Sequence, residues 1–298
     1  MPSISVARAS NATFAPKSRP VVVVFGGTSG IGAGTARAFA THLNGAIHLV
    51  VVGRSRGGYD ALVSSLPHHP DSLYEFVPAD LMLLRNVRAL TTELRTNSRN
   101  TLRAPLAKIN YFLISSGAWF IGHPGTEDGL SPVMALGLYV AAALGEDARV
   151  MTVGYAGAGG EVYLDDLGLR KDYGMSKWKA AYMTYQDVFC LEVARLHPTI
   201  SITHVFPGLV DSKLGDTLPW YLKYPYYALL ALMSTTPEKC GEWMMYAMVD
   251  PTAKTGAHFK SDKADAVPAS KYATPAARAK VWGHLVLTNE KVLTEGRA

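Results

Sequence analysis

The chain has 298 residues, of which 48% are hydrophobic and 18% are charged, and its formal net charge is +5. This composition excludes a disordered or fibrous chain and predicts a globular protein with a substantial core. The positive charge is not gathered in a Lys/Arg block, so we expect no nucleic-acid partner. Cys190 and Cys240 are the only cysteines. They are too few for a disulfide framework or a metal cluster, so we expect a reducing, cytoplasmic compartment and no metal.

Residues 1–19 are rich in Ser, Ala and Arg and contain no acidic residue. We expect them to form an N-terminal arm that packs on a single domain of residues 20–298; a weak transit peptide is the alternative. No apolar run along the chain reaches the roughly 18–20 residues that span a bilayer, so we expect no transmembrane segment.

The next stretch combines a strand, a glycine-rich turn and a helix. Val21–Phe25 is a continuous apolar run, typical of a strand buried on both faces of a parallel sheet. The chain then reads GGTSGIG, and an alanine-rich helix starts near Ile31. Because free N–H groups and the positive end of the helix dipole face an anion there, the pattern predicts a pyrophosphate site. A tight turn without a ligand is the alternative. The predicted binding residues are Gly26, Thr28, Ser29, Gly30, Ile31 and Gly32.

A second apolar run, residues 46–52, predicts a buried strand that ends just before Arg54 and Ser55. In a dinucleotide-binding sheet, the end of this strand meets the adenosine ribose. An acidic residue there would bind the 2′-hydroxyl, whereas an arginine and a serine suit a 2′-phosphate. No acid stands at this point, so we expect NADP(H) rather than NAD(H). A solvated arginine in a loop is the alternative.

Strands and helices alternate along the rest of the chain, which predicts an α/β fold with a parallel sheet. We expect a single Rossmann-like, doubly wound sheet with helices on both faces and ligands at the carboxyl ends of its strands. The further predicted strands are residues 73–77, 109–114, Arg149–Val153, 201–206 and an edge strand at 255–259. The predicted helices are residues 59–66, 83–96, 128–144, 172–196, Pro237–Val249 and 273–288, and residues 154–160 are expected to form a flexible loop.

Trp220–Met233 is the most apolar and aromatic segment outside the strands. We expect a helical lid near residues 213–235 that is buried over a hydrophobic small-molecule substrate. An interfacial membrane helix and a dimer surface are the alternatives.

One combination of motifs resembles the short-chain dehydrogenase/reductase family over roughly residues 20–260. Tyr173-Gly-Met-Ser-Lys177 follows the fifth predicted strand, behind the glycine turn and ahead of Pro207-Gly208. The run from Asp165 to Leu169 that precedes it resembles a subgroup common among fungal NADP-dependent reductases.

The resemblance implies roles for individual residues. Tyr173 and Lys177 match the family's catalytic pair. On a helix, a spacing of four places both on one face, and the lysine would favour the phenolate of Tyr173 and hold the cofactor ribose. The other positions that the resemblance assigns to the cofactor are Asp80 and Leu81 beside the adenine, Ser116 and Gly117 in the turn after the fourth strand, and Pro207, Gly208, Val210 and Ser212 beside the nicotinamide.

The chain departs from the family pattern at two places. The family's catalytic serine lies at the end of the fifth strand, where this chain reads Val153-Gly154-Tyr155-Ala156, so Tyr155 is the candidate for the missing hydroxyl. The family's active-site asparagine is also absent, with Gly137 nearest to its place. The helix that usually forms the family's dimer is shortened, which leaves the oligomeric state open.

The resemblance therefore implies an NADP(H)-dependent oxidoreductase that reduces a carbonyl, or oxidises an alcohol, of a hydrophobic small molecule, with secondary metabolism as a setting. The alternative is a non-redox protein that binds NADP(H) and acts as an isomerase, a cyclase or a binding subunit.

Overall fold

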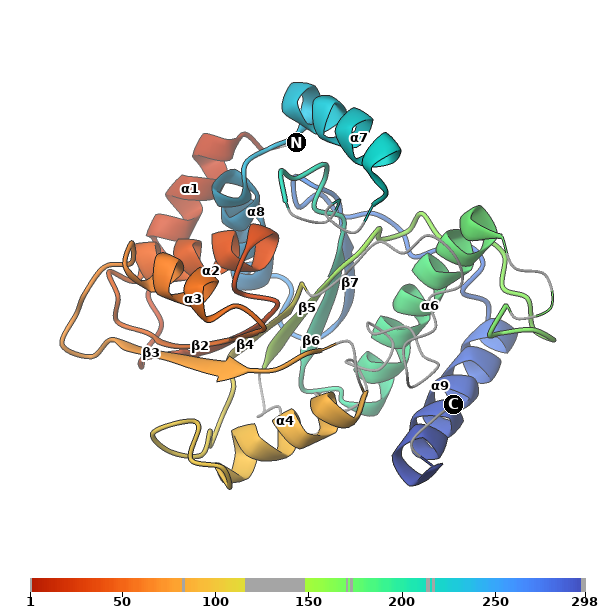
Figure 1. Ribbon diagram of the computed structural model, residues 1–298, viewed down its shortest axis with the longest axis horizontal. Helices are drawn as coiled ribbons and strands as arrows, with labels where there is room; N and C mark the ends of the chain where they lie inside the picture. The colour runs from red at the N-terminus through yellow and green to blue at the C-terminus, as the bar shows by residue number, and fades with distance from the viewer. Residues whose placement is uncertain are drawn as a thin grey trace.

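The computed structural model describes residues 2–81, 84–115, 148–169, 171, 174–212, 215 and 218–295 (Figure 1). The strands in these ranges form one seven-stranded sheet in the order β3-β2-β1-β4-β5-β6-β7, and every neighbouring pair is parallel. The predicted doubly wound α/β fold is confirmed. The strands are β1 Val21–Phe25, β2 His48–Gly53, β3 Leu73–Pro78, β4 Tyr111–Ile114, β5 Arg149–Val153, β6 Ser201–Val205 and β7 Gly256–Lys260.

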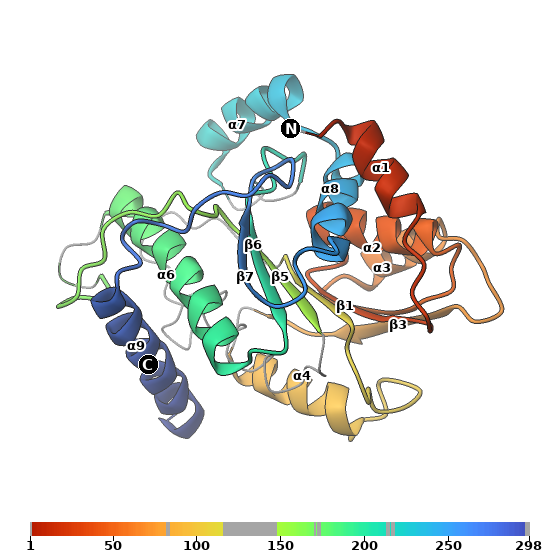
Figure 2. The same cartoon turned by 180° about the vertical axis from the view of Figure 1, so that it is seen from behind.

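Helices cover both faces of this sheet, and the alternation within β1 shows why (Figures 1 and 2). Val22 and Val24 pack with α1, α2, α3 and α8 on one face, and Val23 and Phe25 pack with α4 and α6 on the other. Successive side chains of a strand point to opposite faces, so a strand between two helical layers must be apolar throughout. The helices are α1 Ile4–Ala12, α2 Gly30–His42, α3 Arg56–Val63, α4 Leu84–Thr96, α6 Met175–Leu196, α7 Trp220–Met233, α8 Pro237–Val249 and α9 Pro275–Glu295.

Two helices form outer layers. The N-terminal arm contains α1, a helix that the sequence does not predict, and α1 packs on α8 with Ala7 and Asn11 buried. Asn11 Nδ2 donates to the carbonyl oxygen and to Oε2 of Glu242, both at 2.9 Å. At the other end of the chain, α9 packs on α6 through Val281 and Leu285.

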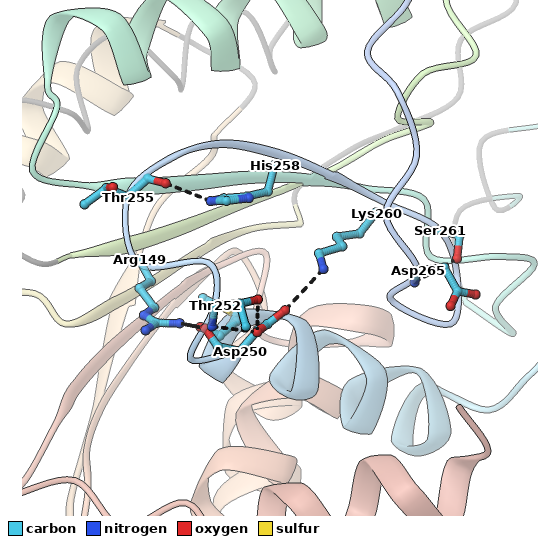
Figure 3. Close-up of polar contacts among 9 residues, drawn as sticks. Arg149, Asp250, Thr252, Thr255, His258, Lys260, Ser261 and Asp265 are labelled. Atoms are coloured by element: carbon cyan, nitrogen blue, oxygen red, sulfur yellow. Dashed lines mark hydrogen bonds and ion pairs between the residues drawn. The ribbon is translucent and has the colours of Figure 1, made fainter. Parts of the chain in front are cut away.

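The edge strand β7 is fastened to the end of α8 (Figure 3). Lys260 Nζ lies 3.2 Å from Asp250 Oδ2, and Arg149 Nη1 donates to the carbonyl oxygens of Met248 and Asp250 at 3.0 and 2.5 Å. A cation at the last carbonyls of a helix is favoured by the helix dipole. These contacts tie β5, β7 and α8 together at their ends.

Most element bounds lie within three residues of those predicted, and α9 is the main exception, because it runs to Glu295 rather than to residue 288. The helix α3 is shifted by three residues towards the N-terminus, and α6 begins at Met175, after an extended Gly174. The predicted helix at 128–144 lies outside the described residues. In the part of the chain that is described, no helix combines the length and the apolar character needed to cross a membrane.

The expectation of a buried lid is wrong. The helix α7 forms where it is predicted, but Trp220, Tyr224 and Leu232 are 74%, 71% and 85% exposed, and Leu230 is its one buried residue among those described. Burial is decided by what packs against a helix, which the apolar composition of the helix alone cannot show.

Candidate active site

The turn between β1 and α2 requires its glycines. Gly26 and Gly30 have positive φ values of 81° and 54°, in the region that residues with a Cβ rarely adopt. Gly26 N donates to Val52 O at 2.9 Å, which fixes the turn at the end of β2. A Cβ on Gly32 would collide with the carbonyl oxygen of Gly26 and with Oγ of Ser115. The turn is therefore tightly folded against the ends of β1 and β4.

The first turn of α2 suits an anion. Ser29 is the N-cap residue, but its side chain makes no capping hydrogen bond, and no acidic residue lies in the first helical turn. The first N–H groups of any helix lack a helical partner. Together with the helix dipole, these groups form a ready site for a phosphate. Ser29 is exposed, and Thr28 and Ile31 are half-buried beside it.

Ser115 holds this turn from the neighbouring strand. Its Oγ lies 3.1 Å from the carbonyl oxygen of Phe25 and 3.4 Å from that of Gly26. The hydroxyl is thus engaged by backbone at the end of β1. The sequence analysis did not predict this contact of Ser115, because the contact depends on the pairing of β1 with β4. Ser116 and Gly117 lie outside the described residues.

Arg54 and Ser55 follow the end of β2, as predicted, but they differ in their contacts. Arg54 is exposed, and no described residue pairs with it. Ser55 caps α3, accepting from Gly58 N at 3.0 Å. The neighbouring Arg56 is engaged locally, with Nε 3.0 Å from Asp60 Oδ1 and its guanidinium 5.4 Å from the ring centre of Tyr59. Arg54 is therefore the cation at this strand end that can reach a ligand.

Asp80 and Leu81 follow β3 at the same edge of the sheet. Leu81 is buried. The carbonyl oxygen of Asp80 accepts from Asn86 Nδ2 at 2.9 Å, and Ala79 N donates to Gly53 O at 3.1 Å. The segment is thus held beside the end of β2, where the predicted adenine site would lie.

The segment after β6 reaches across to the glycine turn. The Cβ of Ser212 lies 3.2 Å from the place where a Cβ on Gly30 would stand. Val210 is buried and forms a parallel bridge with Thr235, and Gly208 has a φ of 75°. Two segments separated by about 180 residues therefore lie side by side at the carboxyl edge of the sheet, where ligands bind in such folds.

The carbonyl of Pro207 is held by a buried thiol. Cys240 Sγ lies 3.7 Å from Pro207 O. Burial raises the pKa of Cys240 to about 12, and the nearby Asp262 carboxylate acts in the same direction. The thiol therefore keeps its proton and acts as a weak donor to the backbone.

The structure describes two of the three predicted catalytic residues, Lys177 and Tyr155. Lys177 lies exposed in the first turn of α6, with Nζ 5.9 Å from the ring centre of Tyr163. Tyr155 is 43% exposed and stacks on Phe206, with ring centres 4.1 Å apart and an interplanar angle of 15°. Tyr173 lies outside the described residues, so its placement relative to Lys177 stays a prediction.

A buried His–Asp pair lies beneath Gly154, and the sequence analysis missed it. His204 Nδ1 and Asp187 Oδ1 are 2.6 Å apart, and both side chains are fully buried. Among the residues that the structure describes, none makes a hydrogen bond with His204 Nε2. A Cβ on Gly154 would collide with this nitrogen and with Oε1 of Gln186. The space for a side chain at Gly154 is therefore already filled from β6 and α6.

The same aspartate fastens the glycine-rich loop at 154–160. Asp187 Oδ2 accepts from Ser270 N at 2.7 Å and from Gly157 N at 3.3 Å. Gly160 N donates to Ala180 O at 2.8 Å. Its glycines serve close packing on α6 rather than the flexibility that we expected. Only the packing of β6 on α6 brings His204 and Asp187 together, which no spacing in the sequence signals.

Comparison with known proteins gives distant relatives. No family model matches the chain. The oxidoreductase andH of Emericella variicolor is 26% identical over 83% of this chain and 74% of its own length. The short-chain dehydrogenase/reductase SAT2 of Stachybotrys chartarum is 26% identical over 83% of this chain and 77% of its own. The polyprenol dehydrogenase of Mus musculus is 27% identical over 90% of this chain and 83% of its own.

Solved structures share the fold. A short-chain dehydrogenase/reductase from Serratia marcescens superposes with a TM-score of 0.57 at 18% identity, covering 87% of this chain and all of the other. The relatives, the sheet order and the glycine turn agree, so the chain has the fold of the short-chain dehydrogenases/reductases and is distantly similar to members of that family.

Proposed function

We propose that the protein is an NADP(H)-dependent oxidoreductase that reduces a carbonyl, or oxidises an alcohol, of a hydrophobic small molecule. The observation that carries this proposal is the glycine turn, where Gly32 leaves no room for a side chain and the first turn of α2 has no acidic residue. Such a turn at the carboxyl edge of a parallel sheet suits a dinucleotide pyrophosphate.

The described residues fit the 2′-phosphate form of the cofactor. Arg54 is exposed at the end of β2, and no acidic residue stands beside it in the sequence, between Gly53 and Arg56. Val210 and Ser212 match the segment that holds the nicotinamide in the family, and Ser212 lies close to Gly30, which supports this assignment. When bound, the nicotinamide would supply or accept a hydride.

In this proposal the proton belongs to Tyr173. Its phenol would donate a proton to the substrate oxygen during reduction and take one back during oxidation. Lys177, as a nearby cation, would favour the phenolate and so ease the transfer. Tyr155 would offer a second hydroxyl at the end of β5, in place of the serine of the family.

A hydrophobic substrate is supported by one comparison. A relative that is 27% identical to this chain is named as a polyprenol dehydrogenase.

Cofactor preference gives the sharpest test. NADPH and NADH binding are measured by fluorescence titration on the wild type and on Arg54→Ala. Loss of the guanidinium is expected to weaken NADPH by about tenfold or more and to leave NADH nearly unchanged. Equal weakening of both would rule out the 2′-phosphate role. Arg56→Ala, whose guanidinium is engaged by Asp60, is the matched control and should discriminate little between the cofactors.

A non-redox role is the second candidate, and the absence of the family's serine at the end of β5 favours it. His204 and Gln186 fill the space beside Gly154, so that position cannot supply the hydroxyl without rearrangement. The protein would then bind NADP(H) and act as an isomerase, a cyclase or a binding subunit. NADPH oxidation against a panel of hydrophobic ketones and aldehydes separates the two. Turnover that disappears in Lys177→Ala supports the reductase; tight binding without turnover supports the second candidate.

A further inference from the structure

The helix α7 presents an apolar surface to solvent. Its outward residues include Trp220, Tyr224, Leu232 and Met233, which are 74%, 71%, 85% and 66% exposed. The helix lies at one end of the molecule, beyond the carboxyl edge of the sheet and apart from the two helical layers (Figures 1 and 2). Large apolar patches on a soluble protein mark surfaces that bind another body.

The pattern of burial shows which face is outward. The half-buried or buried residues of the helix follow one another at intervals of three or one residues, along one stripe. They are Lys223, Tyr226, Tyr227 and Leu230. Residues at this spacing share a face. The only charged residue of α7 is therefore on its inner stripe. The outer face carries aromatic and aliphatic side chains with no charge.

The segment that carries α7 is anchored at its base. Thr235 N donates to Leu209 O at 2.8 Å, and Asp211 N donates to Thr235 O at 2.9 Å. Lys223 Nζ lies 5.9 Å from the ring centre of Tyr227, which adds a contact along the inner stripe. The apolar face is thus held outward by a fixed base. A helix that is apolar on every side is normally covered.

We propose that α7 docks on a lipid bilayer that contains anionic lipids. Tyrosine and tryptophan, which make up five of the fourteen residues of α7, suit the boundary between headgroups and acyl chains because each joins an apolar ring to a polar atom. The helix lies along the surface, since it is too short to cross.

Charge favours a bilayer over a second copy of this chain. The protein carries a net charge of +5, and neither α7 nor α1, whose first turn lies at the same end of the molecule, contains an acidic residue (Figure 1). Two copies of a cationic protein repel each other, whereas an anionic surface attracts both.

Vesicle flotation with the full chain tests the docking. Vesicles of phosphatidylcholine, with and without phosphatidylserine, are mixed with the wild type and with the double variant Tyr224→Ser/Leu232→Ser. We expect the wild type to float with the anionic vesicles, and more weakly with phosphatidylcholine alone or at high salt. The double variant should partition about tenfold or more weakly, because it loses two apolar side chains that would enter the bilayer.

The matched control is Leu287→Ser on α9, which removes a leucine that is 67% exposed elsewhere on the surface. It should float like the wild type. Thermal melting and NADPH titration establish that each variant is folded, and they report on the cofactor site independently of docking. No flotation of the wild type, or equal flotation of the double variant, would overturn the proposal. A wild-type dimer that the double variant converts to monomer, without flotation, would show instead that α7 joins two copies.

Discussion

The two halves of the carboxyl edge of the sheet, one at the ends of β1 and β2 and the other at the end of β5, differ in the residues that they carry. At the ends of β1 and β2, the glycine turn keeps the tight geometry that a phosphate needs, and Arg54 points to no partner within the described protein. At the end of β5 the chain has no serine, and His204 and Gln186 fill the space beside Gly154. In the proposed function, binding of the dinucleotide and the chemistry performed on it therefore depend on separate structures, and one can change while the other stays.

The largest effect should come from closing the glycine turn. In Gly32→Ala, the new Cβ meets the carbonyl oxygen of Gly26 and Oγ of Ser115, so the turn must open. We expect NADPH binding to weaken by about 100-fold or more, measured by fluorescence titration. Gly283→Ala is the matched control, because nothing lies within 4 Å of its Cβ position in α9. It should leave binding unchanged and raise the free energy of unfolding by about 0.5–1 kcal/mol.

The second prediction concerns the hydroxyl at the end of β5. Tyr155→Phe keeps the ring that stacks on Phe206 and removes only the oxygen. If Tyr155 replaces the serine of the family, turnover should fall by about 10- to 100-fold while the melting temperature and NADPH binding stay the same. Unchanged steady-state kinetics would show that this half of the site uses another group.

A third prediction asks whether the serine can be restored. In Gly154→Ser, the side chain collides with His204 Nε2 and Gln186 Oε1. We expect the free energy of unfolding to fall by about 1–3 kcal/mol in urea titration, with no gain in turnover. Tyr155→Ser, which places the hydroxyl at an exposed position instead, is the companion variant. A stable and faster Gly154→Ser enzyme would contradict the steric account.

The smallest predicted effect is the pH dependence of the stability that Glu93 contributes. It sets the pH range in which the two halves of the carboxyl edge can be compared. Glu93 on α4 accepts from Ser98 Oγ at 2.9 Å, Arg99 N at 2.8 Å and Thr101 Oγ1 at 2.7 Å. Although burial opposes ionisation, these hydrogen bonds lower the pKa of Glu93 from 4.5 to about 2. Its stabilisation is fully present above pH 4.5 and is lost as the pH falls through about 2.

The variant Glu93→Gln should therefore melt about 3–6 °C lower than the wild type at pH 7. The difference should shrink as the pH falls from 4.5 towards 2, because the wild-type carboxyl then becomes neutral too. Differential scanning calorimetry across this range checks it. A gap between the two proteins that stays constant with pH would contradict the role of the charged carboxylate.

The sequence predicts the elements that are dictated locally. Val21–Phe25 is recognisable because a strand covered on both faces is apolar at every position, and the glycines after it permit the positive φ values that the turn uses. The helix α1 is not recognisable, because its burial depends on Glu242 in a helix far along the chain. For the same reason, the exposure of α7 and the contact of His204 with Asp187 required the tertiary structure. The apolar composition of α7 is clear in the sequence, but the direction of its apolar face is not.

The docking of α1 on α8 has a consequence for the order of folding. Asn11 and its partner Glu242 are separated by 231 residues, so α1 cannot dock until α8 has been made. Contacts of such long range are slow to form, because the intervening chain must first be organised. We therefore expect the packing of α1 on α8 to be among the late steps of folding.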